Sequence, residues 1–541
     1  MKLRNFTKYA SRLLLGSLML TGPALAQDLP GLAEPTLGQA SAPGTGPGST
    51  PNVEVKERTM KVNHFSLEGE VGTQPEGLPA LLGEYEGREL SLREMKELAA
   101  SISQMYRDSG RLLTQAYIPN QSFRDGQVKI AVIEGKVDKI KIEGNKSYSE
   151  ELIRDYMKDA VQNGTFKTDE FERSLLLLND LPDMKVSAHL VKGSQKGVVD
   201  AVLKVEEDKT FHVNLDYNNF GSRFTGEQRL GLGFDIDNIA GNGDNLYLRS
   251  VLSFLPTGSV FYNLGYRTPI NSEGTSVGFD YANGAFTAGR EFAILDVRGS
   301  ADIYTFSVAQ ALERSLAFSS NFGAAISYKN SDSRLLGFQQ AHDRYVCGRV
   351  SWQGDWREVE GRTLFQISMT QGLGGMANND PLASRVGARS NFTKFNADVA
   401  RVQNLAPGFY GIVRGTGQFA WQPLYTGEEF ALGGPDTVRG YPQASYLGDT
   451  GYVLSAEARW SPLEDTEALQ FAAFIDHGGV TRRNPQLGDV RSVHLTGAGI
   501  GLRSNFTENT SLRLDLGFPI SSADNFNNHA PVLYGALRTR F

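Results

Sequence analysis

Residues 211–218 read Phe-His-Val-Asn-Leu-Asp-Tyr-Asn, and this stretch decides the fold. Its large apolar side chains, Phe211, Val213, Leu215 and Tyr217, alternate strictly with polar ones. Alternation with a period of two is typical of a strand that has one apolar face and one polar face. A soluble sandwich and a membrane-spanning barrel share this pattern, so a single strand does not distinguish them.

The same alternation recurs toward the C-terminus, for example at residues 452–460 and 512–516. Roughly 330 residues follow the first such run, and at about 20 residues per strand and connection they predict about 16 strands. Beyond the N-terminal region, no segment approaches the length of apolar sequence that a spanning helix needs. We therefore expect a transmembrane antiparallel β-barrel over residues 208–541.

The last expected strand alternates up to the final residue of the sequence. One face carries Leu533, Gly535, Leu537, Thr539 and Phe541, and the other carries Arg538 and Arg540. A terminal strand that ends on an aromatic residue resembles the signal that the outer-membrane assembly machinery reads. Phe541 is therefore a candidate barrel assembly signal.

The N-terminal region indicates export. Four basic residues precede an apolar stretch at residues 13–20, and Ala24-Leu-Ala26 has the small-x-small form of a cleavage site. Residues 1–26 are therefore expected to be a signal peptide. The alternative, an uncleaved anchor, is disfavoured because the apolar stretch is short and ends near Pro23. Residues 27–58 are rich in Pro and Gly and are expected to form a linker.

Composition excludes several classes of site. Cys347 is the only cysteine, so no disulfide forms within the chain, and we expect it to be an ordinary strand side chain. The formal net charge of −7 argues against a general nucleic-acid binder. The seven histidines show no metal-binding spacing, so neither a metal nor another cofactor is expected. Gly241-Asn-Gly-Asp-Asn245 has calcium-like residues but is expected to be a tight hairpin turn.

Residues 59–135 predict a small α+β domain. Ser91 and Glu94 have the spacing of a capping box, and apolar residues at helical spacing follow them until about Tyr106. Gly110 is expected to end this helix. Strands are expected at residues 62–67, 115–118 and 127–133.

Residues 136–207 predict a second domain with a similar order of elements. Strands are expected at residues 137–142, 185–192 and 198–206, and helices at residues 150–161 and 169–179. The two segments have similar lengths, enough for a sheet with one face covered by helices. The alternative is one larger α+β domain that includes both.

The chain resembles the two-partner secretion transporters, the haemolysin secretion/activation proteins of the Omp85 superfamily, over about residues 59–541. The first domain ends with Gly110-Arg-Leu-Leu-Thr-Gln-Ala-Tyr-Ile-Pro-Asn-Gln121, Gly126 and Val132-Ile-Glu-Gly135. These residues resemble the family's first POTRA domain, and residues 137–207 resemble its second. Asn219-Phe-Gly-Ser-Arg-Phe-Thr-Gly226, Asp237-Asn238, Gly241, Gly243 and Asp244 resemble its first barrel hairpin.

Two motifs carry the mechanism that the resemblance implies. Glu429-Phe-Ala-Leu-Gly-Gly434 leads into Val438-Arg-Gly-Tyr441, the tip of a long extracellular loop that folds back into the barrel in this superfamily. The second motif is Phe474-Ile-Asp-His-Gly478, one face of which is implied to line the lumen. The resemblance implies that Arg439 pairs with Asp476. The candidate residues are Val438, Arg439, Gly440 and Tyr441 in the loop, and Phe474, Asp476 and Gly478 in the strand.

The implied function is secretion of a large exoprotein with an N-terminal secretion domain across the outer membrane of a Gram-negative bacterium. The POTRA domains would capture the unfolded partner in the periplasm, by strand addition at residues 115–118 or 185–192. Outer-membrane lipid and the barrel assembly machinery are further expected partners. The sequence departs from family members that have an N-terminal plug helix, because Pro30 and Pro35 interrupt the corresponding stretch.

Three alternatives remain beside this interpretation. An outer-membrane protein insertase of the same superfamily would share the barrel motifs but usually has more POTRA domains. A porin or a ligand-gated receptor would need neither the POTRA domains nor the Val438–Tyr441 loop. An enzyme is suggested only by Gly274-Thr-Ser-Val-Gly278, which lacks the following helix that a nucleophile elbow requires.

Overall fold

The computed structural model describes most of the chain after residue 58. It covers residues 59–69, 74–109, 111, 113–121, 126–134, 136–162, 165–166, 168–192, 198–254, 258–375, 380–463, 468–521 and 530–541. The expected signal peptide, the expected linker, Gly110 and Gly135 lie outside these residues. The described residues up to Asp180 group with Met184–Glu207 in one compact unit, and Leu181–Asp183 group with Asp208–Phe541 in another.

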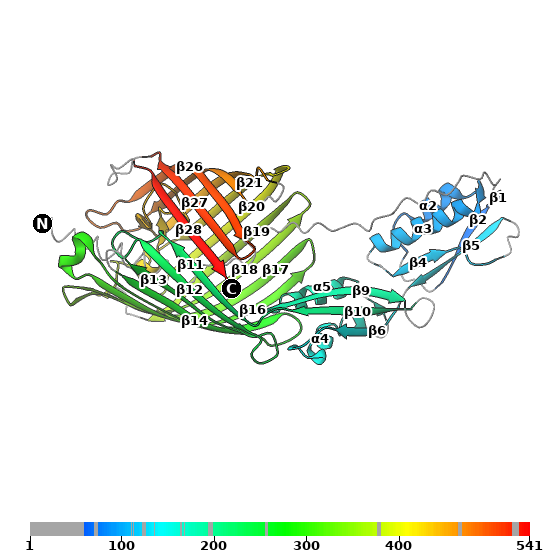
Figure 1. Ribbon diagram of the computed structural model, residues 1–541, viewed down its shortest axis with the longest axis horizontal. Coiled ribbons are helices and arrows are strands. Elements are labelled where there is room, and N and C mark those ends of the chain that lie inside the picture. Colours follow the sequence, from blue (N-terminus) through cyan, green and yellow to red (C-terminus); the bar gives the residue numbers. More distant parts are fainter. Residues whose placement is uncertain are drawn as a thin grey trace. The chain divides into compact units, whose positions relative to one another are not determined.

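The first part of the chain forms a three-stranded sheet with helices along it (Figure 1). Its elements are β1 (Thr59–Lys61), β2 (His64–Glu68), α2 (Leu78–Tyr85), β3 (Glu89–Ser91), α3 (Leu92–Asp108), β4 (Thr114–Tyr117) and β5 (Gln127–Glu134). The sheet has the order β2-β5-β4, with β2 parallel and β4 antiparallel to β5. The strand expected at residues 62–67 begins only at His64, because Val62 turns away to accept a backbone bond from Gly87.

The capping box at the start of α3 is confirmed. The Glu94 backbone N–H donates to Ser91 Oγ at 3.3 Å, and the Ser91 N–H donates to Glu94 Oε2 at 2.7 Å. The apolar side chains of this helix face the sheet, where Met95, Leu98 and Ile102 are buried. A single apolar core therefore stabilises this part of the chain.

The following part forms a second three-stranded sheet, with the order β6-β10-β9. Its elements are β6 (Lys136–Glu143), α4 (Glu150–Tyr156), β7 (Val161–Gln162), β8 (Thr165–Phe166), α5 (Thr168–Asn179), β9 (Met184–Lys192) and β10 (Val198–Glu207). The helix predicted over residues 150–161 was too long, because α4 ends at Tyr156. The apolar pattern continues beyond Tyr156 because Met157 and Ala160 are buried, but these residues lie in turns rather than in the helix.

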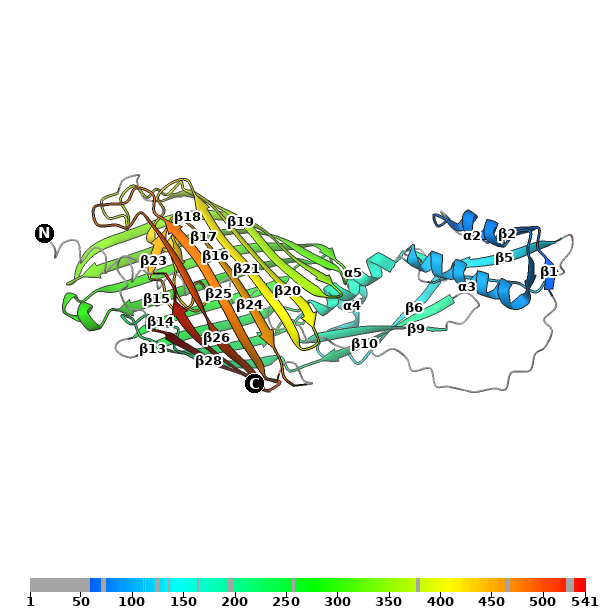
Figure 2. The same cartoon turned by 90° about the horizontal axis from the view of Figure 1, so that it is seen from above.

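The rest of the chain closes into an antiparallel barrel of 16 strands, which confirms the predicted fold. The strands run obliquely around the barrel, as Figure 2 shows. They are β11 (Phe211–Asn218), β12 (Gln228–Asp237), β13 (Asn245–Phe254), β14 (Ser259–Pro269), β15 (Thr275–Thr287), β16 (Arg298–Arg314), β17 (Phe318–Leu335), β18 (Phe338–Glu358), β19 (Gly361–Gly375), β20 (Thr393–Ala406), β21 (Phe409–Ala420), β24 (Thr450–Trp460), β25 (Gln470–Thr481), β26 (Ser492–Thr507), β27 (Thr510–Pro519) and β28 (Val532–Arg540).

The two faces of the barrel wall differ in chemistry. On β11 the alternating apolar residues Phe211, Leu215 and Tyr217 are exposed, and comparable exposed apolar residues occur on the other barrel strands. Charged residues such as Asp476 and Asp515 are instead fully buried inside. An apolar outer surface and a polar interior are what a barrel surrounded by lipid requires.

The barrel closes where its last strand meets its first. β28 pairs with β11, and the pairing extends to Phe541, whose N–H donates to the Val213 carbonyl at 2.9 Å. The Phe541 side chain is exposed on the same outer face as Leu533 and Leu537. Among the described residues, no helix is both long and apolar enough to cross a membrane.

Two short stretches singled out in the sequence have clear structures. The connection between β12 and β13 covers residues 238–244, so it is longer than the tight turn expected there. Asn238, Gly241 and Gly243 have positive φ angles in it, which a longer turn with several direction changes needs. The Gly274–Gly278 stretch leads into strand β15, so it has no nucleophile-elbow geometry.

Candidate functional site

The long connection between β21 and β24 folds back against the inner wall of the barrel. It contains a short 3-10 helix, η2 (Thr426–Glu428), and a small hairpin of β22 (Phe430–Leu432) and β23 (Tyr446–Gly448). Its Leu432, Val438 and Tyr441 side chains are completely buried. They pack against inner-facing apolar side chains of β24, β25 and β26, so the loop has its own small core inside the barrel.

Arg439, near the loop's tip, binds Asp476 of β25 through three hydrogen bonds. Its side-chain Nε donates to Asp476 Oδ2 at 2.7 Å, and Nη2 donates to Oδ1 at 2.9 Å. The Arg439 backbone N–H also donates to Oδ2, at 3.1 Å. Asp476 is inaccessible to solvent and Arg439 is 4% exposed. A bidentate, charge-assisted pair of this kind sets both position and orientation of the loop tip.

The neighbouring strands extend this pair into a network of alternating charges. Arg439 Nη1 donates to Glu457 Oε2 of β24 at 2.6 Å, and the guanidinium carbon lies 3.3 Å from the centre of the Phe474 ring. Around it lie further pairs: Arg459 with Glu457 at 2.7 Å, and Arg503 with Asp515 at 2.8 Å. Each buried charge in the network therefore faces an opposite one, as burial requires.

Glycines on the barrel wall let the loop backbone come close. A Cβ atom added to Gly497 of β26 would lie 1.9 Å from the Arg439 carbonyl oxygen. One added to Gly517 of β27 would lie 2.5 Å from the Gly440 nitrogen. Gly440 itself has a φ of 98°, which L side chains rarely adopt. The loop tip therefore fits only where these residues lack side chains.

Tyr441 completes the contact on the far side of the tip. Its hydroxyl lies 2.6 Å from the Ser521 carbonyl and 2.9 Å from the Thr496 carbonyl, which share its one proton, and it accepts from the Ser521 N–H at 3.2 Å. Tyr534 of β28 donates to the Tyr441 carbonyl at 2.6 Å and accepts from the Gly440 N–H at 3.1 Å. The tip is thus connected to the last four barrel strands.

A second set of buried ion pairs holds the base of the loop. Glu428 accepts from Lys329 at 2.5 Å and pairs with Lys394 at 2.7 Å. Glu429 pairs with Arg385 at 3.0 Å and Arg482 at 3.1 Å. These carboxylates are 2% and 7% exposed. The loop is therefore anchored by charge at both its base and its tip.

The structure brings all seven candidate residues of the two motifs into one site. Val438, Arg439, Gly440 and Tyr441 contribute the loop side, and Phe474, Asp476 and Gly478 lie on the inner face of β25. Phe541 lies apart from them, at the barrel closure. The sequence analysis missed Glu428, Glu457, Gly497 and Tyr534. Of these four, only Glu428 could have been found from the sequence, because it directly precedes the quoted Glu429–Gly434 stretch.

The chemistry of this site is that of an anchor. Its charged groups are compensated by one another, and they hold the loop against the barrel wall. Among the described residues, the one group of three His, Cys, Asp or Glu side chains that could hold a metal ion lies elsewhere, at Asp183, His212 and Asp237.

Two family models match parts of the chain. A family model for the haemolysin secretion/activation protein ShlB/FhaC/HecB matches residues 197–504. A model for the POTRA domain, ShlB-type, matches residues 60–135.

Two relatives extend over most of the chain. The heme/hemopexin transporter protein HuxB of Haemophilus influenzae is 25% identical over 464 residues, which are 83% of this chain and 81% of HuxB. The outer membrane transporter CdiB of Dickeya dadantii is 22% identical over 484 residues, 86% of this chain and 82% of CdiB. The solved structure of CdiB from Escherichia coli has a similar fold, with a TM-score of 0.70, 17% identity and coverage of 99% of this chain and 98% of CdiB.

Proposed function

Because the chain belongs to the haemolysin secretion/activation family ShlB/FhaC/HecB, we propose that it carries one dedicated exoprotein through its own barrel to the cell surface. Proteins of this family are two-partner secretion transporters, and this chain is an outer-membrane transporter of a secreted exoprotein, with its POTRA domains in the periplasm. The observation that carries the proposal is the loop held inside the barrel by Arg439 and Asp476.

The periplasmic sheets offer edges for capture of an unfolded partner. β4 and β9 each lie at an edge of their three-stranded sheet, which supports strand addition there. We favour β9, because it is nine residues long against four for β4. It also exposes two apolar side chains, Leu190 and Val191. An extended exoprotein segment would gain backbone hydrogen bonds along β9 and apolar contacts from these side chains.

A substitution tests this docking edge. Leu190→Ser combined with Val191→Ser should lower secretion of the partner while leaving the barrel in the membrane, because exposed side chains contribute little to folding. Leu92→Ser is the control, since Leu92 is at least as exposed as Leu190 and Val191 but lies on helix α3. Equal secretion by the double variant and the control would contradict docking at β9.

In this proposal the anchored loop is a fixed part of the secretion path. Arg439→Ala or Asp476→Ala would leave a buried, unpaired charge and release the loop tip, so export should fall strongly. The barrel should still fold, because its closure depends on strand pairing. Arg362→Ala is the control, since Arg362 forms a similar bidentate pair with Asp355 at 2.8 Å on the barrel wall. Normal export by both Arg439→Ala and Asp476→Ala would refute the role of the pair.

The Phe541 side chain has a separate proposed role, as the assembly signal of the barrel. Phe541→Ala should reduce the amount of folded barrel in the outer membrane, whereas export per folded barrel should stay the same. Leu487→Ala is a control on another highly exposed apolar side chain of the barrel unit. Unchanged barrel amounts in Phe541→Ala would show that the signal lies elsewhere.

The experiment that tests the whole proposal compares secreted and outer-membrane proteins with and without the gene. Loss of one large exoprotein from the surface and the medium, with other barrels unchanged, is the expected result and identifies the partner. A broad fall in many outer-membrane barrels would instead favour the insertase interpretation.

A further inference from the structure

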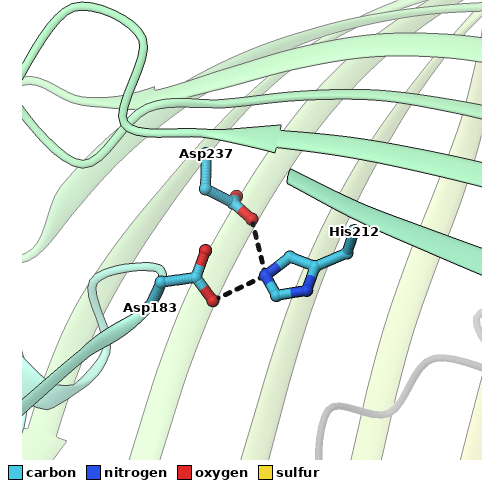
Figure 3. Close-up of side chains that lie close together, drawn as sticks. All are labelled: Asp183, His212 and Asp237. Atoms are coloured by element: carbon cyan, nitrogen blue, oxygen red, sulfur yellow. Dashed lines mark hydrogen bonds and ion pairs between the residues drawn. The ribbon is translucent and has the colours of Figure 1, made fainter. Parts of the chain in front are cut away.

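Three potential metal ligands meet in the barrel unit, away from the anchored loop (Figure 3). His212 lies on β11 and Asp237 is the last residue of β12. Asp183 comes from the short Leu181–Asp183 segment, which groups with the barrel. The sequence analysis expected no metal. It missed this group because 29 residues separate Asp183 from His212 and the ligands come from three different elements.

The donor atoms are close enough to share one ion. His212 Nε2 lies 2.8 Å from Asp183 Oδ1 and 3.8 Å from Asp237 Oδ2. All three donor atoms lie within 4.8 Å of one another. In a tetrahedral zinc site with bonds of about 2.0–2.2 Å, the ligand atoms lie roughly 3.4 Å from one another. This separation falls between the two distances from His212 Nε2 to the carboxylate oxygens. An ion would therefore fit after small side-chain movements.

The charges of the group are not balanced by the protein. Two carboxylates face one imidazole, and the three side chains are only 8–12% exposed. Among the residues described, no Lys or Arg nitrogen lies within 4.0 Å of either carboxylate. The nearby Arg249 pairs with Asp235 instead, at 2.7 Å. Asp183 Oδ2 is buried without a hydrogen-bond partner. An uncompensated buried carboxylate is costly, and a cation bound between these side chains would remove that cost.

Outer contacts hold the ligands in this arrangement. Asn245 donates to Asp237 Oδ1 at 2.6 Å, which leaves Oδ2 directed toward His212. The Asp208 N–H donates to the Asp183 carbonyl at 2.9 Å, and Asp183 has a φ of 53°, which few non-glycine residues adopt. Such supporting contacts orient ligands in known metal sites.

We propose that Asp183, His212 and Asp237 bind a divalent transition-metal ion such as Zn²⁺. One imidazole nitrogen with two carboxylate oxygens suits this class of ion, and a fourth position would be left for water. The ion would neutralise the two carboxylates and fix the Leu181–Asp183 segment against β11 and β12.

Zinc binding to the purified full-length protein tests the site. The protein is prepared in detergent without a histidine tag, stripped with EDTA and titrated with ZnCl₂ by calorimetry. One equivalent should bind and raise the Tm of the barrel. His212→Ala and Asp237→Asn should weaken binding by at least about 100-fold, because loss of an outer contact alone costs about 10–100-fold. His342→Ala should bind like the wild type, since His342 faces a single carboxylate, Asp332, at 3.1 Å.

A second measurement covers the case in which His212→Ala does not fold. Co²⁺ added to the stripped wild type should give the visible absorption of a protein-bound, low-symmetry ion, and Asp237→Asn should lose it. Absence of saturable Zn²⁺ and Co²⁺ binding would overturn the proposal, as would equal binding by wild type and Asp237→Asn. The three side chains would then be held together by hydrogen bonds alone, and their contribution to Tm would not depend on metal.

Discussion

The ion pairs inside the barrel and those on the periplasmic unit have similar lengths but very different surroundings. Arg439 and Asp476 approach to 2.7 Å with side chains 5% and 1% exposed. Lys204 and Glu206 approach to 3.0 Å with side chains 59% and 65% exposed. Water and salt screen the exposed pair, so it contributes little, whereas breaking the buried pair leaves a charge without compensation.

The difference reflects how each unit is stabilised. In the first periplasmic sheet, buried apolar side chains of α2, α3 and the strands form one continuous core. The barrel turns most of its apolar side chains outward, so its interior has only small apolar clusters. An element placed inside the barrel must therefore be held largely by buried charges and hydrogen bonds.

The largest effect is expected at the base of the loop. Glu428→Ala removes the carboxylate between Lys329 and Lys394 and leaves two ammonium groups whose side chains are only 22% and 14% exposed, which should destabilise the loop by about 3–5 kcal/mol. Limited proteolysis of the purified protein should then cleave the loop, whereas the wild-type loop should resist cleavage. Glu358→Ala is the control, because Glu358 pairs with Arg401 at 2.7 Å but is 40% exposed. Equal protease resistance of the two variants would mean that burial does not decide the strength of these pairs.

A smaller effect is expected from close packing at the loop tip. Gly497→Ala places a Cβ atom against the Arg439 carbonyl and should destabilise the loop by about 1–3 kcal/mol. Gly417→Ala is the control, since its nearest neighbour would lie at an ordinary 3.9 Å. The same proteolysis assay distinguishes the two variants. If the loop of the Gly497→Ala variant resisted the protease as well as the wild-type loop does, the tip would be able to move away from the added Cβ atom without a loss of stability.

Local patterns predicted much of the fold. The alternation at Phe211–Tyr217 and its repeats predicted the barrel and its approximate strand number, because a two-residue period is a local property. The capping box at Ser91 predicted the start of α3 for the same reason. The helix at residues 150–161 was too long, since buried Met157 and Ala160 continue an apolar pattern that a turn can also satisfy.

The site was predictable only where a motif carried it. Arg439 and Asp476 stood in recognisable stretches, whereas Glu457 and Arg503 are single charges on β24 and β26 that become neighbours only when both strands pair with β25. Gly497 is one of 59 glycines, and nothing around it in sequence distinguishes it. Contacts between distant strands depend on register and closure, which no local pattern encodes.

The periplasmic unit should respond more weakly to loss of a polar contact. Ser91→Ala removes the cap of α3 and should lower the stability of that domain by about 1 kcal/mol. Ser101→Ala on the exposed side of the same helix is the control, because its hydroxyl only bonds the preceding turn, at Glu97. Thermal unfolding of the full-length protein, monitored through hydrogen exchange of the α3 amides, measures the difference in stability between the two variants. Equal protection of α3 in both variants would refute the capping contribution.

The smallest effect is expected for the exposed pair. The hydrogen bond from Lys204 lowers the pKa of the Glu206 carboxyl. Stability from the pair would therefore be present above the ordinary Glu pKa and lost as pH falls through the lowered value. Because both side chains are exposed, Lys204→Ala should leave Tm unchanged at neutral pH. A Tm decrease that is present at neutral pH and disappears in acid would show that this pair stabilises the fold, and burial alone would then not explain the contrast with Arg439 and Asp476.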